Sequence, residues 1–398
     1  MQFSYLKKLI NPPLPIHMEG YMRRVADTLH DDIEAQILVF ELSGQIVIWC
    51  VLDLILISQA FGDRLRQQLS EVSGMSVDHI MISATHTHSG PQTSDMLTPI
   101  EDVNPAYLDH IEKTLETGVK EALEKLTEVS ANYQEIDFGH HFYSNRNVEE
   151  AYSNQTGYLL RFKNTADEVI LDLLNFNCHP TILKEDTLAL STDLIGSLRR
   201  HYTEKTGNPL AIYLGEAGDV STRFKRQGTD FAEVERVGKG LTEFLLVSDW
   251  KDIKLDNLEL SEINLSIPYN PLEDKDFSEN YEKVSALIGD NPDYRFMQNM
   301  MSNLLETHIG KLIYTGHLLN LGQVIITFFP GEIVAQLGKN IRSSNDKPVL
   351  LAAYTNAFNG YAVNQEDYGK YGETFFSRYP RGVADQFVAK FIAKLEAM

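Results

Sequence analysis

Five short clusters of residues that are able to bind a metal or catalyse a reaction each follow an apolar, strand-like run of this chain. In α/β proteins the ligand lies beyond the carboxyl ends of the strands, where the loops converge, so we expect the clusters to meet in one cleft. This pattern indicates an enzyme. The clusters are Thr85-His86-Thr87-His88, Asn177-Cys178-His179-Pro180, Gly218-Asp219-Val220-Ser221, Pro330-Gly331-Glu332 and residues 356–361.

The two histidines of the first cluster are candidate metal ligands. In an extended strand, residues two apart project to the same side, so His86 and His88 are expected to face one site while the threonines face away. The alternative is a pair of loop histidines that form local hydrogen bonds, and so short a motif is compatible with both. His179, a single histidine before a proline, has the same two interpretations, and its neighbour Cys178 is expected to point away from it.

Glu332 directly follows an apolar run, so its carboxylate needs either solvent or a partner, because burying an unpaired charge costs several kcal/mol. Two partners are compatible with the sequence. One is the N-terminus of a following helix, whose dipole favours an acidic residue. The other is a metal ion.

The collinear order of these motifs resembles the catalytic domain of the neutral/alkaline ceramidase family. Its most specific pieces are the Thr-His-Thr-His-Ser-Gly-Pro run at 85–91 and the Phe-Pro-Gly-Glu run at 329–332. The resemblance implies one catalytic domain over residues 1–398, with an α/β fold of mixed sheets flanked by helices. Further matching pieces are Pro12-Pro13-Leu14, residues 20–23, Asp53, Asn145-Arg146, residues 178–181, residues 218–221 and Gly360-Tyr361.

The resemblance also implies a zinc site made by His86, His179, Glu332 and Tyr361. A site of two histidines and a carboxylate with an open position suits hydrolysis, because zinc lowers the pKa of bound water to about 7 and polarises a carbonyl. Tyr361 is expected either to bind the metal as a phenolate or to remain beside it as a hydrogen-bond donor.

Other residues receive supporting roles from the same resemblance. His88 and Arg146 are expected to stabilise the oxyanion or orient the substrate. Ser221 is expected near the zinc, either as a nucleophile or as a substrate contact, and the general acid is not identified. Asp193 is a candidate for supporting a metal ligand through a hydrogen bond.

The expected function is that of a zinc-dependent amidohydrolase of sphingolipid or related lipid metabolism, in which zinc-activated water cleaves ceramide or another N-acyl compound. The alternatives are a zinc hydrolase of esters or small polar amides on the same scaffold, and a non-catalytic metal-binding relative. Arg223 stands where the ceramidases have an amide side chain, which favours a more polar or anionic substrate group. The chain is also shorter than the full ceramidases and is expected to lack their carboxyl-terminal immunoglobulin-like domain.

Composition excludes several classes of protein. The 398 residues, 43% of them hydrophobic, are enough for a large core. With 35 Lys and Arg against 56 Asp and Glu, the net charge of -21 disfavours nucleic acid and anionic membranes. Two cysteines are too few for a disulfide framework, and no run is apolar enough for a signal peptide or a membrane helix. We expect a cytoplasmic protein of undetermined oligomeric state, although a leader removed before this numbering is also compatible.

The elements that must position these clusters alternate between strand and helix patterns, which favours one interleaved α/β domain. The polar segment 273–308 is expected to form helices over the core or a lid. Strands are predicted at 36–42, 45–52, 131–138, 157–162, 169–176, 312–320 and 323–329, and helices at 55–72, 104–126 and 193–202, after Glu332 and after Gly382.

Overall fold

The structure is a computed structural model that describes all residues except 22, 97–101, 248 and 289–309. Within the described residues, the largest sheet has nine strands in the order β14-β12-β11-β9-β1-β5-β6-β7, with β16 also paired to β9. The β6–β7 and β12–β14 pairs are parallel and the other pairs are antiparallel. The strands are β1 Gln2–Leu9, β5 Glu34–Leu42, β6 Gln45–Leu52, β7 Ile80–Ala84, β9 Thr127–Asp137, β11 Thr156–Asn164, β12 Val169–Phe176, β14 Leu210–Leu214 and β16 Lys251–Ile253.

A smaller sheet packs face to face on the large one. Its described strands, in the order β17-β18-β19-β21, are β17 Glu259–Tyr269, β18 Gly310–Asn320, β19 Ile325–Phe328 and β21 Val349–Ala352. Alternate residues of both sheets point into the layer between them, as strand geometry requires. The Trp49 ring of β6 lies 5.1 Å from the Phe328 ring of β19, measured between centroids, and 4.7 Å from the Tyr213 ring of β14. Each such buried ring contributes roughly 1.5–3 kcal/mol to folding.

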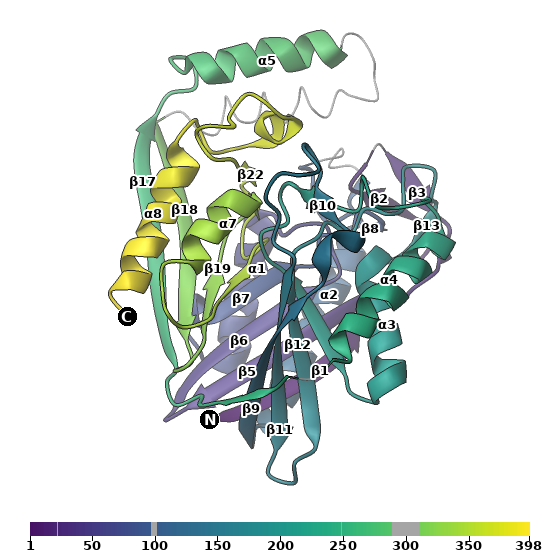
Figure 1. Cartoon of the computed structure of the whole chain (residues 1–398), viewed down its shortest axis with the longest axis vertical. Coiled ribbons are helices and arrows are strands. Elements are labelled where there is room, and N and C mark those ends of the chain that lie inside the picture. The colour runs from purple at the N-terminus through teal and green to yellow at the C-terminus, as the bar shows by residue number, and fades with distance from the viewer. Residues whose placement is uncertain (22, 97–101, 248, 289–309) are drawn as a thin grey trace.

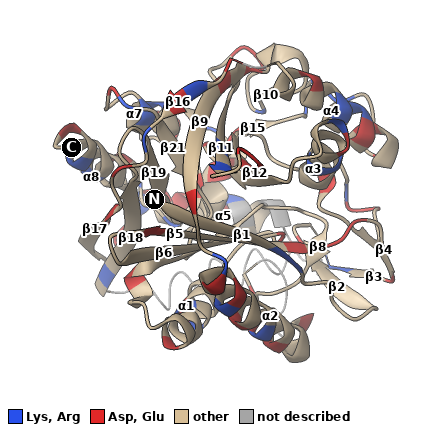
Figure 2. Cartoon of the chain, turned by 90° about the horizontal axis from the view of Figure 1, so that it is seen from below, with Lys and Arg blue, Asp and Glu red and all other residues tan. Residues whose placement is uncertain are grey.

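Helices cover the outer faces of both sheets (Figure 2). The pairs α1–α2 and α3–α4 lie on the large sheet, and α7–α8 lies on the small sheet. The predicted fold class, mixed sheets flanked by helices, is therefore confirmed. The helices are α1 Gln59–Ser73, α2 Pro105–Glu124, α3 Asp193–Thr206, α4 Phe231–Leu245, α5 Lys275–Ile288, α7 Ala335–Arg342 and α8 Val383–Glu396, with short 3-10 turns at η1 Val77–His79, η3 Gly139–His141 and η5 Gly372–Phe376.

Most predicted elements occur within a few residues of their predicted bounds, whereas β1, α4, β16, β17 and the strands of two to four residues near the loops were not predicted. The predicted helical segment 273–308 is confirmed only over α5, because residues 289–309 lie outside the described part of the chain. None of the described helices is both long enough and apolar enough to cross a membrane.

Very short strand pairs position the loops at one end of the sheets, where β10 and β22 lie in the upper part of Figure 1. In the pair β20–β22, Glu332 lies opposite Tyr361, and in the pair β10–β15, Ser144 lies opposite Ser221. The short strands are β2 Ile16–Glu19, β3 Arg24–Ala26, β4 Thr28–Leu29, β8 Gly90–Pro91, β10 Ser144–Asn145, β13 Ala189–Leu190, β15 Val220–Ser221, β20 Glu332–Ile333 and β22 Tyr361–Ala362.

Candidate active site

Three histidines and one glutamate from distant segments converge at this end of the molecule. His86 and His88 follow β7, His179 follows β12, and Glu332 begins β20. Glu332 Oε2 lies 2.9 Å from His179 Nε2 and 3.3 Å from His86 Nε2, and His88 Nε2 lies 3.2 Å from His86 Nε2. Except for the partly exposed His88, these side chains are buried.

A backbone carbonyl fixes the orientation of each imidazole ring. A carbonyl oxygen only accepts hydrogen bonds, so the Nδ1 atom facing it carries a proton, and in the neutral ring Nε2 keeps a lone pair that points to the centre. Such carbonyls support metal-binding histidines. The contacts are His86 Nδ1 to the Ile55 carbonyl at 2.6 Å, His88 Nδ1 to the Gly20 carbonyl at 2.8 Å and His179 Nδ1 to the Ala217 carbonyl at 2.5 Å.

Among the described residues, the Asp193 carboxylate forms no hydrogen bond with a histidine ring. It accepts hydrogen bonds from the backbone N–H groups of Ile182 at 3.4 Å and Leu183 at 2.9 Å. Burial raises the pKa of Asp193 to about 6, although the hydrogen bonds from those backbone N–H groups lower it. Asp193 therefore fixes the loop that follows His179, and the backbone carbonyl of Ala217 has the role that the sequence analysis gave to Asp193.

The local backbone at His86 differs from the extended strand that the sequence analysis assumed. Strand β7 ends at Ala84, and His86 has a positive φ of 62°. Thr85 donates a hydrogen bond from Oγ1 to Asp53, and Thr87 donates one to the Ser191 carbonyl. These buried threonine contacts hold a turned backbone, and both histidine rings face one centre because of the turn.

The predicted helix N-terminus is not the partner of Glu332. Helix α7 begins at Ala335, and its first N–H donates to Asp219 Oδ1 at 2.7 Å. Gly331, with a φ of 140°, permits the close approach of two segments, because a Cβ atom there would lie 2.6 Å from the Gly360 carbonyl oxygen. Glu332 thus belongs to a short parallel strand pair whose partner carries Tyr361.

With each Nδ1 proton bonded to a carbonyl, the neutral imidazoles and Glu332 present hydrogen-bond acceptors to the centre, and the donors beside them are Arg146 and the Tyr354 hydroxyl. Burial and the neighbouring His86 and His179 rings hold the pKa of His88 well below its usual range, and burial and Arg146 lower the pKa of His179 to about 4. Burial alone raises the pKa of Glu332, but a proton on the facing His86 or His179 ring stabilises the carboxylate, outweighs burial and holds the pKa well below its usual range. Facing lone pairs and a carboxylate need a cation among them, either a proton on a ring or a metal ion. Neutral imidazoles and a carboxylate are the ligands that zinc takes, so these residues fit zinc.

Arg146 and Tyr361 lie beside this centre. The guanidinium carbon of Arg146 lies 5.3 Å from the Tyr361 ring centroid, and its Nη1 lies 3.4 Å from His179 Nε2. Burial raises the pKa of Tyr361, although Arg146 opposes the shift, so the side chain is a neutral phenol unless a cation binds it. Arg146 remains charged, because Tyr361 and Glu373 outweigh the effect of burial and raise its pKa.

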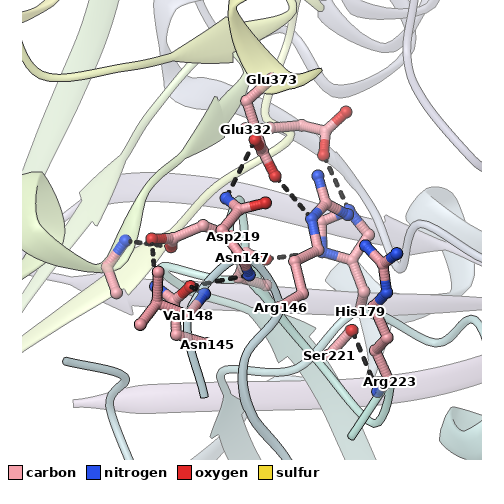
Figure 3. Close-up of polar contacts among 12 residues, drawn as sticks. Asn145, Arg146, Asn147, Val148, His179, Asp219, Ser221, Arg223, Glu332 and Glu373 are labelled. Atoms are coloured by element: carbon pink, nitrogen blue, oxygen red, sulfur yellow. Dashed lines mark hydrogen bonds and ion pairs between the residues drawn. The ribbon is translucent and has the colours of Figure 1, made fainter. Parts of the chain in front are cut away.

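Two acidic residues hold Arg146 and its neighbours in place (Figure 3). Glu373 accepts from Arg146 Nε at 2.7 Å and from Asn147 Nδ2 at 3.0 Å. Asp219 accepts one hydrogen bond from Asn145 Nδ2 at 2.7 Å and another from the first N–H of α7. The loop that carries Arg146 is therefore fixed from both sides.

Ser221 lies next to His179, and the two residues form an isolated parallel bridge. Its Oγ accepts a hydrogen bond from the backbone N–H of Arg223 at 3.2 Å. Among the described residues, no imidazole or carboxylate contacts this oxygen as a base would.

Sequence reasoning missed Glu373, Tyr354 and the Gly20 carbonyl. Tyr354 stacks on His86 with ring centroids 4.3 Å apart, and its hydroxyl donates to Glu332 Oε2 at 3.4 Å. It ends an apolar run and has the pattern of a core residue. Glu373 lies in a short 3-10 turn without a motif, and a carbonyl contact leaves no mark on residue type.

Comparison with solved structures identifies the fold of this chain. The neutral ceramidase from Pseudomonas aeruginosa matches with a TM-score of 0.76 and 17% identity, over 100% of this chain and 75% of that chain. A ceramidase structure complexed with C2 matches with a TM-score of 0.76, 16% identity and the same coverage. The chain has the neutral ceramidase fold. No family model and no curated protein matches the sequence.

The neutral ceramidase fold agrees with the resemblance that the motifs indicated. At 17% identity the likeness establishes the fold alone. The roles of His86, His179, Glu332 and Tyr361 therefore depend on the contacts described above.

Proposed function

We propose that this protein is a zinc-dependent amidohydrolase that cleaves an N-acyl compound with water. The observation that carries this proposal is the convergence of three imidazole lone pairs and the Glu332 carboxylate beside a fixed arginine. His86, His179 and Glu332, with Tyr361 beside them, would hold the zinc ion. Zinc at this position would supply a Lewis acid for the carbonyl and lower the pKa of a water molecule.

The remaining residues act on the substrate. Arg146 is charged and fixed by Glu373, so it suits the negative charge that develops on the carbonyl oxygen, and such a donor is typically worth about 3–4 kcal/mol. His88 is neutral with its Nδ1 proton bonded to Gly20, so its Nε2 accepts a proton or a substrate hydrogen bond. Orientation and proton transfer thus fit His88 better than donation to an oxyanion. In the reaction, the water oxygen bonds to the carbonyl carbon, one water proton passes to the amide nitrogen as the C–N bond breaks, and a carboxylic acid and an amine are released.

The test is hydrolysis of N-octanoyl amides by protein that has been stripped with a chelator and then reloaded with zinc. We expect turnover with zinc and none with chelator, and loss of turnover in Glu332→Gln. His201→Ala is the control variant. His201 lies away from the site, and its Nε2 atom is 2.9 Å from a carboxylate oxygen of Glu235. Parallel assays with the matching octanoyl esters separate an amidase from an esterase. Zinc-loaded wild-type protein that cleaves neither series would contradict the proposal and favour a non-catalytic metal-binding protein.

A further inference from the structure

Two cavities of different chemistry reach the same centre. The larger, of about 450 Å³, is lined by five charged side chains, and the smaller, of about 190 Å³, has mainly apolar walls. His88 and Tyr361 line both cavities, so the reacting centre lies where the cavities meet. The charged residues of the larger cavity are Arg146, Lys184, Arg223, Arg226 and Glu373. The apolar walls of the smaller one include Ile55, Met96, Phe358 and Phe376, and its charged residues are Glu332 and Arg378.

The charge of the larger cavity is opposite to that of the molecule. The chain has a net charge of -21, yet this cavity has four cationic side chains and a single carboxylate. That carboxylate, Glu373, is already bonded to Arg146. No described carboxylate forms an ion pair with Lys184, Arg223 or Arg226. A cationic wall in an acidic protein, with three cations that form no ion pair with a described carboxylate, is typical of a site for an anion.

The three cations belong to segments next to the site, and the Arg226 side chain is held there by a hydrogen bond. The backbone N–H of Arg223 donates to Ser221 Oγ at 3.2 Å, and Figure 3 shows the two residues side by side. Arg226 Nη1 donates to the Thr181 carbonyl at 2.9 Å, two residues beyond His179. Lys184 Nζ lies 5.5 Å from the Tyr21 ring centroid.

The environment of Lys184 reports the same local excess of positive charge. Burial, Arg226 and Arg223 lower the pKa of Lys184 to about 8, although Glu185 and Asp193 oppose the shift. A bound anion would relieve this repulsion.

We propose that the substrate is an amide with a carboxylate on one side of the scissile bond, bound by Lys184, Arg223 and Arg226, and an apolar group on the other side, bound in the smaller cavity. This inference rests on the proposed function. The fork of an arginine matches a carboxylate in a bidentate manner. A neutral two-chain lipid would desolvate these cations without pairing them, which costs free energy. Hydrolysis releases a carboxylic acid and an amine, one of which carries the additional carboxylate.

The kinetic test compares matched substrates with the zinc-loaded protein. Octanoylglycine and octanoylglycinamide differ only in the charge of the terminal group. We expect a kcat/KM about tenfold higher for octanoylglycine at low ionic strength, the lower end of the range for a charged hydrogen bond. This preference should shrink in about 1 M salt, where the Debye length is about 3 Å. A second pair of substrates tests the reverse placement of the carboxylate, on the acyl side of the amide. Its charged member is the monoamide of succinic acid with octylamine, and in its neutral member the free carboxylate is replaced by a carboxamide.

Variants locate the effect. Arg223→Ala and Arg226→Ala are each expected to lower the ratio of the two specificity constants severalfold. Lys225→Ala is the control, because Lys225 is paired with Glu149 at 2.6 Å and does not line the cavity, so its ratio should match wild type. Equal kcat/KM values for the charged and neutral members of both substrate pairs would refute the carboxylate-binding site. Cleavage of those substrates would still support the proposed amidohydrolase function.

A binding measurement separates this inference from the proposed function. The ketone isostere of octanoylglycine, in which a methylene replaces the amide nitrogen, cannot be hydrolysed. Calorimetry should give tighter binding of this carboxylate than of its carboxamide, and the difference should shrink in Arg223→Ala. If no amide is cleaved but this difference is present, the site stands and the proposed function fails. Equal binding of both isosteres overturns the site.

Discussion

Backbone carbonyls decide which nitrogen of each histidine faces the centre. The Ile55, Gly20 and Ala217 carbonyls each bind an Nδ1 proton, and this common arrangement turns all three Nε2 atoms inward. Because the same geometry serves His86 and His88, ring orientation does not separate a metal ligand from a residue that acts on substrate. The surroundings of the rings separate the two roles. Of the three histidines, His88 alone lines both the charged cavity and the apolar cavity.

His88→Ala is therefore expected to retain zinc and to lose turnover, with a fall in kcat on the order of 10²–10³. His86→Ala and His179→Ala are expected to lose the metal itself. Elemental analysis after zinc reloading, together with kcat, separates the two outcomes. Equal loss of zinc in His88→Ala and His86→Ala would mean that His88 is a ligand.

Ser221→Ala is expected to slow the enzyme without stopping it, because no described base contacts the hydroxyl. A loss below about tenfold in kcat/KM corresponds to one neutral hydrogen bond. Mass spectrometry of protein quenched during turnover provides the check. An acyl adduct on Ser221 would make the serine a nucleophile, with a burst in the first turnover.

Motif chemistry predicted the residues that converge but not the contacts that orient them. Histidine, glutamate and arginine after strand ends are visible in a sequence, because their types are rare beside apolar runs. The Gly20 carbonyl is not visible, since every residue has a carbonyl. Glu373 holds Arg146 through a hydrogen bond, and the two residues are far apart in the sequence, so the contact is visible only in the folded protein.

At the scale of elements, strands that form long apolar runs were predictable and two-residue strands were not. Strand β12 is a largely apolar run whose last six residues are all buried, whereas β20 and β22 have two residues each and no pattern of their own. The pairing of β20 with β22 nevertheless places Glu332 opposite Tyr361. The hydrogen bond from the first N–H of α7 to Asp219 likewise joins segments that are separate in the sequence.

Strand β2 provides a pH-dependent prediction through Glu19, which precedes the carbonyl that orients His88. Burial raises the pKa of Glu19 from 4.5 to about 7, although the hydrogen bonds that Glu19 accepts from Ser94 and Thr93 lower it. The folded state thus holds the proton more tightly than the unfolded state, so the stabilisation is complete below pH 4.5 and is lost as pH rises through 7. The free energy of unfolding should fall by about 3 kcal/mol over that range.

Glu19→Gln removes this ionisation, so the variant is expected to lose less stability than wild type between pH 5 and pH 8. Chemical denaturation at both pH values measures the difference. Glu71→Gln, at an exposed position on α1, is the control and should follow wild type. Parallel pH profiles for wild type and Glu19→Gln would refute the assignment.

At the scale of the whole molecule, we propose that residues 1–398 form a single domain. One contiguous core cluster extends from Ile10 to Leu395, and the second core layer joins the two sheets. The predicted candidates lie on both sheets, with His86 and His179 after strands of the large sheet and Glu332 after a strand of the small one. The site is complete only when the two sheets pack together.

Metal binding is therefore expected to stabilise the whole fold. Zinc that binds the folded protein adds RT ln(1 + [Zn]/Kd), or about 4 kcal/mol at free zinc a thousandfold above Kd. It also supplies the cation that the facing lone pairs and Glu332 require. Thermal unfolding in excess zinc and in chelator should give clearly different midpoints for wild type and for His88→Ala, and one shared midpoint for His86→Ala. His201→Ala controls for the loss of any histidine, and coincident midpoints for wild type in zinc and in chelator would argue against a metal site between the two sheets.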